Sequence, residues 1–563
     1  MAAIVFASVF TGSPAGAQDP LPFTRPLTPD APTEQGRFGA AVAHGNRVLI
    51  VGAPGDSLRG TEAGSVFVFD RDGTTGTYTS TQQLMPPELL PFDRFGETVA
   101  IFGNVLAVGA VGDDSAAPNS GAVYVFVRDG SGLPFQMVAK LVAPAGLAGS
   151  GDRFGAAVSV FLDRVAVGAP QMDAVAFESG AVFVFDVDQT SLQVQPASIL
   201  TDPAGRAGDG LGCSVAVGLE RVAAGAERFD PPGGPFHAGG VLFFEDDASM
   251  AWPLSETLVS TRPETGAEFG ASIALESPRS IIPGTLVVGE PMAARPGETT
   301  PRGVVHVFEA SVGGLWNHVF DHGIDDLRSG TMRGTAVSAQ SGFALVSAPG
   351  RSGGRGGIDI LRRTPNGDWE FVREVTLPGS AIEDRAGIGL TYRNNIPVIG
   401  APGLDGGVGV DQGIVWTSSA LWADVGEARC APAVPNSTGT FASIAGRGSA
   451  KVSNNTFTLQ GEHLQPFNFV LPLAATDSGF VPGAGGSLGN LCLGGSIGRF
   501  LGSIQIVDPT GQVEVPVDLS LVPQPSGLVQ VSPGETWHFQ LWFRDSVLGA
   551  SSNYTSALEV NFE

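Results

Sequence analysis

One segment recurs seven times along the 563-residue chain, and this repetition constrains the fold more than any other feature. Each copy opens with Phe-Gly or a remnant of it, continues through a segment of the Val-Gly-Ala-Pro type, and closes with a glycine followed by an apolar run. A period of this length holds about four short strands with their turns, which is the size of one propeller blade. The opening glycines are spaced by 57, 59, 57, 58, 64 and 53 residues, and they are Gly39, Gly96, Gly155, Gly212, Gly270, Gly334 and Gly387.

The third strand expected in each copy is apolar on both faces. Residues 66–69, 123–126 and 182–185 contain no charged residue, whereas a strand with one wet face would alternate apolar and polar positions. Both faces must therefore be covered, as happens when blades stack around an axis. We predict an all-β fold with a seven-bladed β-propeller. Residues 21–27 precede the first copy where a fourth strand would stand, so we expect them to complete the last blade and close the ring.

The repeats end near residue 424, and the remainder of the chain has a different pattern. Residues 425–563 are expected to form short strands separated by turn clusters, which favours a compact β-sandwich. Cys430 and Cys492 both lie in this segment and are expected to pair; a disulfide closing so long a loop adds on the order of 4 kcal/mol. Cys213 lies in an inner strand of the fourth repeat and is expected to stay a buried thiol.

Charge and hydropathy exclude several classes of protein. The net charge is −25 and the only lysines are Lys140 and Lys451, so a phosphate backbone would be repelled and general nucleic-acid binding is not expected. No run of 18 apolar residues suggests a transmembrane helix. Residues 2–10 are apolar and residues 15–17 read Ala-Gly-Ala, which predicts a signal peptide over residues 1–17. No basic residue precedes Arg25, so either the true start lies upstream of Met1 or the signal assignment is wrong.

The seven repeats resemble the FG-GAP repeat of integrin alpha-subunit propellers, and more closely its bacterial secreted versions. The copies beginning RFGAAVAHGNRVLIVGAP at Arg37 carry the resemblance, which covers about residues 20–424. Residues 490–500, 533–540 and 542–545 are similar to a C-terminal module of large secreted proteins from planctomycete-type bacteria. These resemblances imply domains at 18–424 and 425–563 and a secreted or cell-surface bacterial protein.

The resemblance also raises calcium, which integrin-type propellers hold in loops of alternating Asp and Asn. The matching turns here, such as residues 44–47 and 102–104, are too short and carry too few carboxylates, so that loop is not carried over. Other acids follow the Ala-Pro segments and should gather on one rim. We interpret them as turn formers, with calcium binding as the alternative, and expect no other cofactor. The candidate ligands are Asp56, Asp113, Asp114 and Asp173, with Asp230 and Asp405 in matching places.

Three further patterns have a structural and a functional interpretation. Asp93, Asp152, Asp209 and Asp384 recur before the opening motif; we favour loop capping over a charged ring for an anionic or glycan ligand. His318 and His322 are four residues apart beside Asp321, a spacing that zinc could use, although no helix is expected there. His306 and Asp359 stand where Phe67 and Phe183 stand in their repeats, and a buried Asp needs a partner.

No catalytic constellation emerges from the sequence, since two Gly-x-Ser-x-Gly matches at residues 485–489 and 494–498 lack the helix that a hydrolase elbow requires. We therefore expect a binding or adhesion protein that presents propeller loops to an extracellular protein or a glycan. An extracellular polysaccharide lyase or hydrolase and a non-catalytic cell-surface spacer are the alternatives.

Overall fold

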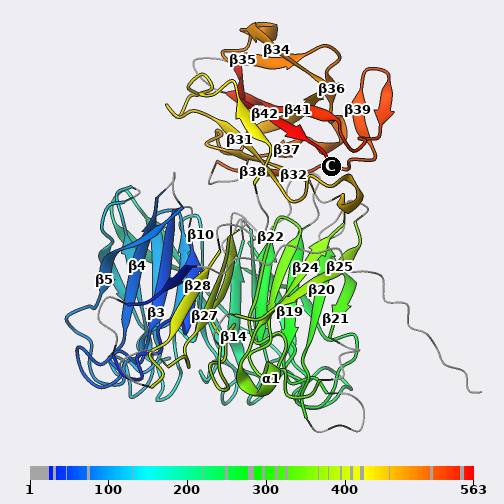
Figure 1. Ribbon diagram of the computed structural model, residues 1–563. Helices are drawn as coiled ribbons and strands as arrows, with labels where there is room; N and C mark the ends of the chain where they lie inside the picture. Colours follow the sequence, from blue (N-terminus) through cyan, green and yellow to red (C-terminus); the bar gives the residue numbers. More distant parts are fainter. Residues whose placement is uncertain are drawn as a thin grey trace, which may run out of the picture.

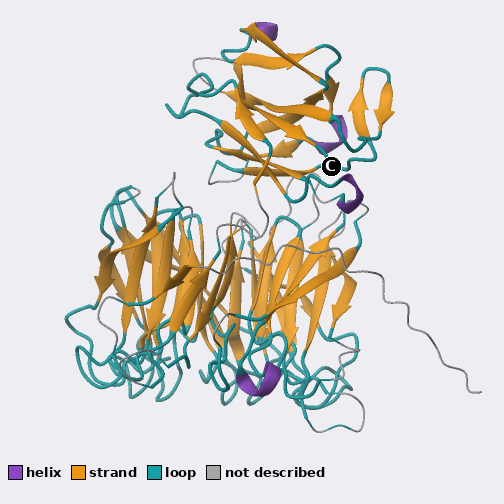
Figure 2. Ribbon diagram, viewed as in Figure 1, coloured by secondary structure: helices purple, strands orange, loops and turns teal. Residues whose placement is uncertain are grey.

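The protein is described here by a computed structural model, in which β-strands and their connecting loops form almost the whole chain (Figures 1 and 2). The all-β fold class is confirmed. No helix within the described residues is long and apolar enough to cross a membrane. The predicted signal peptide, residues 1–17, lies outside the described residues. The structure describes residues 25–563 except 30–32, 46, 73–75, 131, 219, 247–251, 277–283, 295–297, 299, 311–314, 324–327, 365–366, 378–379, 394–395, 406–409, 419–423, 456, 508–510 and 546–550.

Seven antiparallel four-stranded sheets, here called blades 1 to 7, follow one another along the described chain. Blades 1 to 3 contain, from the inner to the outer strand, β2 (Ala41–His44), β3 (Val48–Ala53), β4 (Ser65–Arg71) and β5 (Tyr78–Leu84); β6 (Phe95–Phe102), β7 (Val105–Ala110), β8 (Ala122–Val127) and β9 (Gln136–Leu141); and β10 (Ala157–Phe161), β11 (Arg164–Ala169), β12 (Ala181–Asp188) and β13 (Gln193–Leu200). Blades 4 and 5 contain β14 (Leu211–Val217), β15 (Arg221–Ala226), β16 (Gly240–Glu245) and β17 (Leu254–Leu258); and β18 (Ser272–Glu276), β19 (Thr285–Glu290), β20 (Val304–Ala310) and β21 (Trp316–His322).

The last two blades contain one helical turn and the strand that closes the ring. Blade 6 contains β22 (Val337–Gln340), β23 (Phe343–Ser347), β24 (Ile358–Arg363) and β25 (Trp369–Val375), with the short α1 (Arg351–Gly354) between its second and third strands. Blade 7 contains β26 (Leu390–Arg393), β27 (Ile396–Ala401), β28 (Ile414–Thr417) and β1 (Arg25–Leu27).

The blades form a closed ring. The inner strand of each blade contacts the inner strands of both neighbours, and β2 contacts β6 on one side and β26 on the other. The N-terminal strand β1 pairs antiparallel with β28, so the outer strand of blade 7 comes from the start of the chain, as the sequence predicts. This pairing joins the two ends of the repeat array and removes the sheet edge that an open array would expose.

The core of the ring is divided into clusters that lie between neighbouring blades. Ile50 of blade 1 packs with Leu106 of blade 2, and Leu49 of blade 1 packs with Val398 of blade 7. Successive residues of one strand thus face different neighbours, because side chains alternate across a strand. This explains why the third strands are apolar on both faces: each face is buried against another blade.

A glycine-to-glycine contact sets the spacing between blades. In every blade but blade 6, the second strand carries its Val-Gly-Ala-Pro glycine against the Phe-Gly glycine of the next blade. A methyl group on Gly52, for example, would lie 2.0 Å from the carbonyl oxygen of Gly96. A methyl group on Gly400 would lie 1.9 Å from the carbonyl oxygen of Gly39, and this pair closes the ring. No side chain fits between backbones this close. Blade 6 has Ser347 at this position, opposite Gly387.

The C-terminal part, residues 424–563, consists of two larger sheets around one core. Leu459 and Val515 of one sheet pack with Phe539 and Leu558 of the other, and a disulfide joins Cys430 to Cys492 as predicted. The first sheet contains β29 (Asp424–Val425), β31 (Ser443–Arg447), β32 (Thr458–Glu462) and β38 (Val513–Pro516); the second contains β30 (Glu427–Arg429), β42 (Ser551–Asn561), β41 (Thr536–Asp545), β33 (Phe469–Ala475), β36 (Gly498–Arg499) and β37 (Gln505–Ile506). Two hairpins complete it: β34 (Asp477–Pro482) with β35 (Asn490–Gly494), and β39 (Val522–Gln524) with β40 (Gly527–Val529).

The C-terminal part sits over one end of the ring (Figure 1). Arg47, which follows the inner strand of blade 1, lies 3.2 Å from Nε2 of His463 across this junction. The opposite end, where α1 lies, carries the loops between second and third strands and between successive blades (Figure 2). The two ends of the ring are therefore not equivalent.

The glycine contact yields a stability prediction. Replacing Gly52 by alanine places a methyl group 2.0 Å from a backbone oxygen of the next blade, and we expect the free energy of unfolding to fall by about 3 kcal/mol, the upper end of the range for overpacking. Urea unfolding followed by fluorescence measures the change. Gly502→Ala is the control, because its methyl group would meet no atom within 4 Å. Equal midpoints for the two variants would contradict the role assigned to this contact.

Candidate functional site

A cavity of about 550 Å³ runs along the axis of the ring. The inner strands of all the blades line it, and Phe467, Ile506 and Val507 of the C-terminal part lie at one mouth. Most of the lining is apolar. Among the described residues, the C-terminal part therefore borders one end of the cavity.

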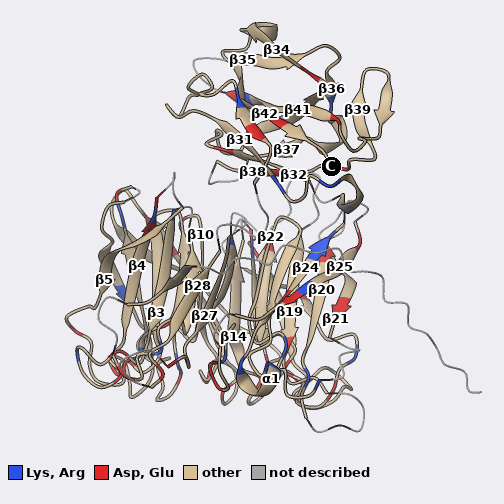
Figure 3. Cartoon of the chain, in the orientation of Figure 1, with Lys and Arg blue, Asp and Glu red and all other residues tan. Residues whose placement is uncertain are grey.

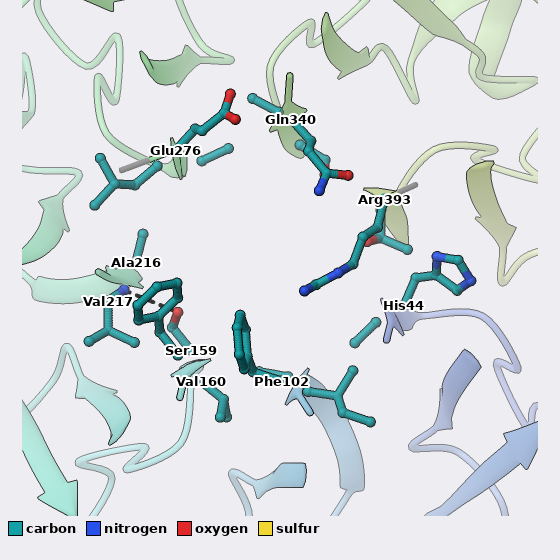
Figure 4. Close-up of a pocket in the computed structure, with 18 of the residues that line it drawn as sticks. His44, Phe102, Ser159, Val160, Ala216, Val217, Glu276, Gln340 and Arg393 are labelled. Carbon is teal, nitrogen blue, oxygen red and sulfur yellow. Dashed lines mark hydrogen bonds between the residues drawn. The ribbon is translucent and has the colours of Figure 1, made fainter. Parts of the chain in front are cut away.

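The polar groups of this cavity are few and mostly engaged (Figure 4). The guanidinium of Arg393 lies 5.0 Å from the centre of the Phe102 ring, a cation–π contact, and Figure 4 shows Arg393 pointing inward. Glu276 accepts a hydrogen bond from the backbone of Ser341 at 2.9 Å. Among the described lining residues Glu276 is the sole carboxylate, whereas glycoside hydrolysis uses a pair.

His44 lies at the edge of the cavity and is held neutral. Its imidazole turns away from the axis in Figure 4, and Tyr78 lies 2.8 Å from its Nε2. Burial, followed by the positive charges of Arg393 and Arg71, lowers the pKa of His44 to about 3. This imidazole therefore carries no charge near neutral pH and does not serve as a cation in the cavity.

The candidate calcium ligands lie in the loops at the end of the ring away from the C-terminal part, where Figure 3 shows many acidic residues. Each of them contacts groups of its own blade or the loop that carries it. Asp56 accepts hydrogen bonds from the Ser65 hydroxyl (2.6 Å) and from the backbone of Leu58. Asp113 pairs with Lys140 at 2.6 Å. Asp114, Asp173, Asp230 and Asp405 accept from backbone N–H groups of Asn119, Glu178, His237 and Asp411.

These contacts fit the turn-forming interpretation of the acids. None of the predicted calcium ligands belongs to the one group of described His, Cys, Asp and Glu residues with the geometry to share a metal. Calcium binding at Asp56, Asp113, Asp114 and Asp173 stays a prediction from the sequence.

The acids before the Phe-Gly motif cap their own loops. Asp93 accepts the backbone N–H of Leu90 at 2.7 Å, and Asp152 accepts that of Gly149 at 2.6 Å. Asp209 and Asp384 make the same bond to the residue three positions earlier, Arg206 and Ala381. All four are buried, and burial raises their pKa values. They position the loops and do not form a charged ring for a ligand.

Large apolar side chains project from the same loops into solvent. Phe177 is 64% exposed and Phe236 is 72% exposed. We call the surface formed by these loops the open face. Its exposed apolar residues are Leu58, Leu90, Phe92, Leu147, Val175, Phe177, Phe236, Met332, Ile382 and Val410.

Blades 5 and 6 hold ionisable groups between their sheets. The carboxylate of Asp359 accepts hydrogen bonds from Nε of Arg333 (2.7 Å) and Nη2 of Arg351 (2.5 Å), and Nε2 of His322 lies 2.9 Å away. The buried Asp therefore has three partners where the sequence predicted that it needs one. Burial alone would raise the pKa of Asp359, but the hydrogen bond from His322 and the two guanidinium charges outweigh burial and lower it. Removing one partner from such a set typically costs about 3–5 kcal/mol.

His306 forms a second set on the other side of blade 5. Its Nδ1 lies 2.7 Å from Oδ1 of Asp321, and its Nε2 lies 2.7 Å from Oε2 of Glu290. His318 also reaches Oδ1 of Asp321, at 2.5 Å. The structure thus joins His318 to His306, whereas the spacing-based expectation paired it with His322, which contacts Asp359 instead. Burial opposes the charged form of His306, but the hydrogen bonds to Asp321 and Glu290 prevail and raise its pKa to about 9.

Three stretches of the ring match the family model of the FG-GAP repeat, at residues 24–69, 78–126 and 135–185. These stretches are FG-GAP repeats. Each matched stretch begins with the outer strand of one blade and ends with the third strand of the next, starting with β1 and ending with β4 in the first case. An FG-GAP unit is therefore offset from a blade by one strand, and the same offset places β1 in blade 7.

The comparison with solved structures gives matches of low similarity. Pseudomonas aeruginosa periplasmic gluconolactonase is 15% identical, with a TM-score of 0.40, over 61% of this chain and 86% of that chain. Saccharomyces cerevisiae Sqt1 is 10% identical, with a TM-score of 0.39, over 67% of this chain and 82% of that chain. Likeness at this level carries no argument about activity. No curated protein sequence matches the chain.

The neutral His44 predicts a pH dependence. The unfolded chain takes up a proton on this imidazole below its ordinary pKa of 6.5, whereas the folded protein does so only near pH 3. The stability is therefore full above pH 6.5 and falls as the pH drops toward 3. Between pH 6.5 and 5 this one group lowers the free energy of unfolding by about 1.5 kcal/mol, so wild type should lose about that much more than His44→Gln, measured by urea unfolding in EDTA.

His237→Asn is the matched control, because this histidine is exposed on a loop and asparagine tolerates its positive φ of 52°. It should keep the wild-type pH dependence. An unchanged pH dependence in His44→Gln would show that another group controls stability in this range.

Proposed function

We propose that this chain is an exported, cell-surface or secreted binding protein whose open face docks on an extracellular protein. The exposed apolar side chains of that face carry the proposal. Ten large apolar residues, with Phe236 at 72% exposure, stand on loops from several blades at one end of the ring, and no described segment of the chain covers them. Groups of exposed apolar side chains rimmed by polar residues are typical of interaction sites.

The asymmetry of the ring supports the same choice of face. The C-terminal part occupies the other end, where Phe467 and Val507 reach the cavity mouth, so a partner docking there would compete with it. At the open face the loops are tied to one another by backbone bonds, such as Gly208 N–H to Phe177 O (2.8 Å) and Gly266 N–H to Phe236 O (3.1 Å). A face held in this way loses little conformational entropy on binding.

The composition of the face favours a protein over a glycan. Aliphatic residues such as Leu58, Val175 and Ile382 accompany the phenylalanines, and an apolar protein surface complements such a mixture, whereas a sugar chiefly uses aromatic faces. The disulfide Cys430–Cys492 suits an oxidising compartment outside the cytoplasm. The FG-GAP repeats add the adhesion class as the context in which such a face would work.

The test is a binding screen with the whole chain, using immobilised extracellular-matrix proteins and a panel of polysaccharides as probes, with calcium and in EDTA. We expect saturable binding to a protein probe. The double variant Phe177→Ser with Phe236→Ser should raise Kd at least about 10-fold, because exposed aromatic anchors commonly contribute 2 kcal/mol or more to an interface.

Leu133→Ser provides the control, because Leu133 is 50% exposed and lies in the β8–β9 connection at the other end of the ring. It should bind as wild type does. Binding to polysaccharides alone would contradict a protein partner and indicate a glycan instead. Turnover of a polysaccharide would favour the enzyme alternative. Equal affinities of all variants would exclude the open face as the binding surface.

A further inference from the structure

Two histidines and a carboxylate on the outer half of blade 5 bring their binding atoms together. Nδ1 of His306 lies 2.7 Å and Nε2 of His318 lies 2.5 Å from Oδ1 of Asp321. One possible ligand atom from each of the three side chains lies within 4.8 Å of the other two. We infer that these three side chains form a binding site for a zinc ion whose fourth position is left to water. Two imidazole nitrogens and one carboxylate oxygen form a ligand set that zinc accepts.

Glu290 supports this site from behind. Its Oε2 lies 2.7 Å from Nε2 of His306 and also accepts the hydroxyl of Ser260 at 3.1 Å. In the tautomer whose Nε2–H donates a hydrogen bond to Glu290, Nδ1 carries a lone pair that points toward Asp321 and toward an incoming cation. A carboxylate that orients a ligand histidine in this way is a usual outer-shell partner in zinc sites.

Blades 1 to 3 show that a blade forms without these side chains. The strand registers give each member of the cluster an equivalent in blades 1 to 3, and no blade there holds even two metal-binding residues at the four positions. In the order Glu290, His306, Asp321 and His318, the equivalents in blade 1 are Ala53, Phe67, Gln83 and Ser80. In blade 2 they are Ala110, Tyr124, Lys140 and Met137. In blade 3 they are Ala169, Phe183, Ile199 and Pro196.

A cation can reach the cluster from solvent. The side chain of His306 is 2% exposed, that of Asp321 16% and that of His318 29%, so exposure rises toward the outer strand β21. The buried histidine is thus fixed in the core of the blade, and the two outer ligands border the solvent. The zinc ion would link β20 to β21 and keep one coordination position accessible.

A cluster held by hydrogen bonds without a metal is the competing explanation, and the distances between the ligand atoms differ between the two arrangements. The N···O distances of 2.5 and 2.7 Å are hydrogen-bond lengths, whereas two ligands of a tetrahedral zinc stand about 3.3 Å apart. Binding therefore requires the ligands to separate by less than about 1 Å, a movement that the exposed His318 and Asp321 can make. The metal would take the place of the proton shared between His306 and Asp321.

The experiment uses the full chain without a histidine tag, stripped with EDTA and titrated with ZnCl2 and with CoCl2. We expect one equivalent of Zn²⁺ to bind, the Tm to rise with zinc concentration, and Co²⁺ to give the visible absorption of a four-coordinate site. His318→Ala should lose this equivalent and the zinc-dependent rise in Tm.

Two further variants separate metal binding from a merely structural effect. Glu290→Gln keeps the ligands and should weaken zinc affinity roughly 10–100-fold, as loss of an outer-shell carboxylate does. His237→Asn removes an exposed histidine elsewhere and should bind zinc as wild type does. No bound equivalent in wild type, or an unchanged equivalent in His318→Ala, would overturn the zinc site and leave only a hydrogen-bonded cluster; neither outcome bears on binding at the open face.

Discussion

The ring depends on how closely neighbouring backbones approach at the Phe-Gly glycines. The second strand of one blade meets the opening glycine of the next so closely that a methyl group on Gly168 would lie 1.9 Å from the carbonyl oxygen of Gly212. That carbonyl side of the motif also receives hydrogen bonds across the blade boundary, as from Ser214 to Gly270 at 2.6 Å. The Phe-Gly glycine of one blade and the Val-Gly-Ala-Pro glycine of its neighbour therefore form a single contact. This explains why both glycines recur together in the repeat.

Much of the fold follows from the sequence because the repeat is local and regular. The spacing of the glycines predicts the four-stranded sheets, and the third strands, apolar on both faces, predict that the blades stack. The segment at residues 21–27 predicts the closure that β1 (Arg25–Leu27) makes with β28. The position of the C-terminal part does not follow. It rests on contacts between residues far apart in the chain, such as Arg47 with His463, and no repeat or spacing encodes them.

The sequence predicted only part of the histidine cluster, because a β-bulge changes which side chains share a face. His318 and His322 have the spacing of a pair, but the register of β20 and β21 shifts between Val307 and Phe308. A bulge breaks the two-residue alternation of a strand, so His318 and Asp321, three apart, face one side of the sheet, while His322 faces the other and meets Asp359. The comparison of repeats shows His306 in place of phenylalanine, and extending it to the second strand would have shown Glu290 in place of alanine.

The two ionisable sets of blades 5 and 6 differ in how well their charges balance. Around Asp359, two guanidinium groups and His322 meet one buried carboxylate, and Oε1 of Glu374 lies 3.4 Å from Nε of Arg351. Around His306, two carboxylates converge on one buried imidazole, and His318 adds a second imidazole beside Asp321. Oε1 of Glu290 has no hydrogen-bond partner among the described residues. A buried group left without a partner costs free energy. When its two imidazoles are neutral, as zinc binding requires, the set in blade 5 holds two carboxylate charges, which the divalent cation would balance.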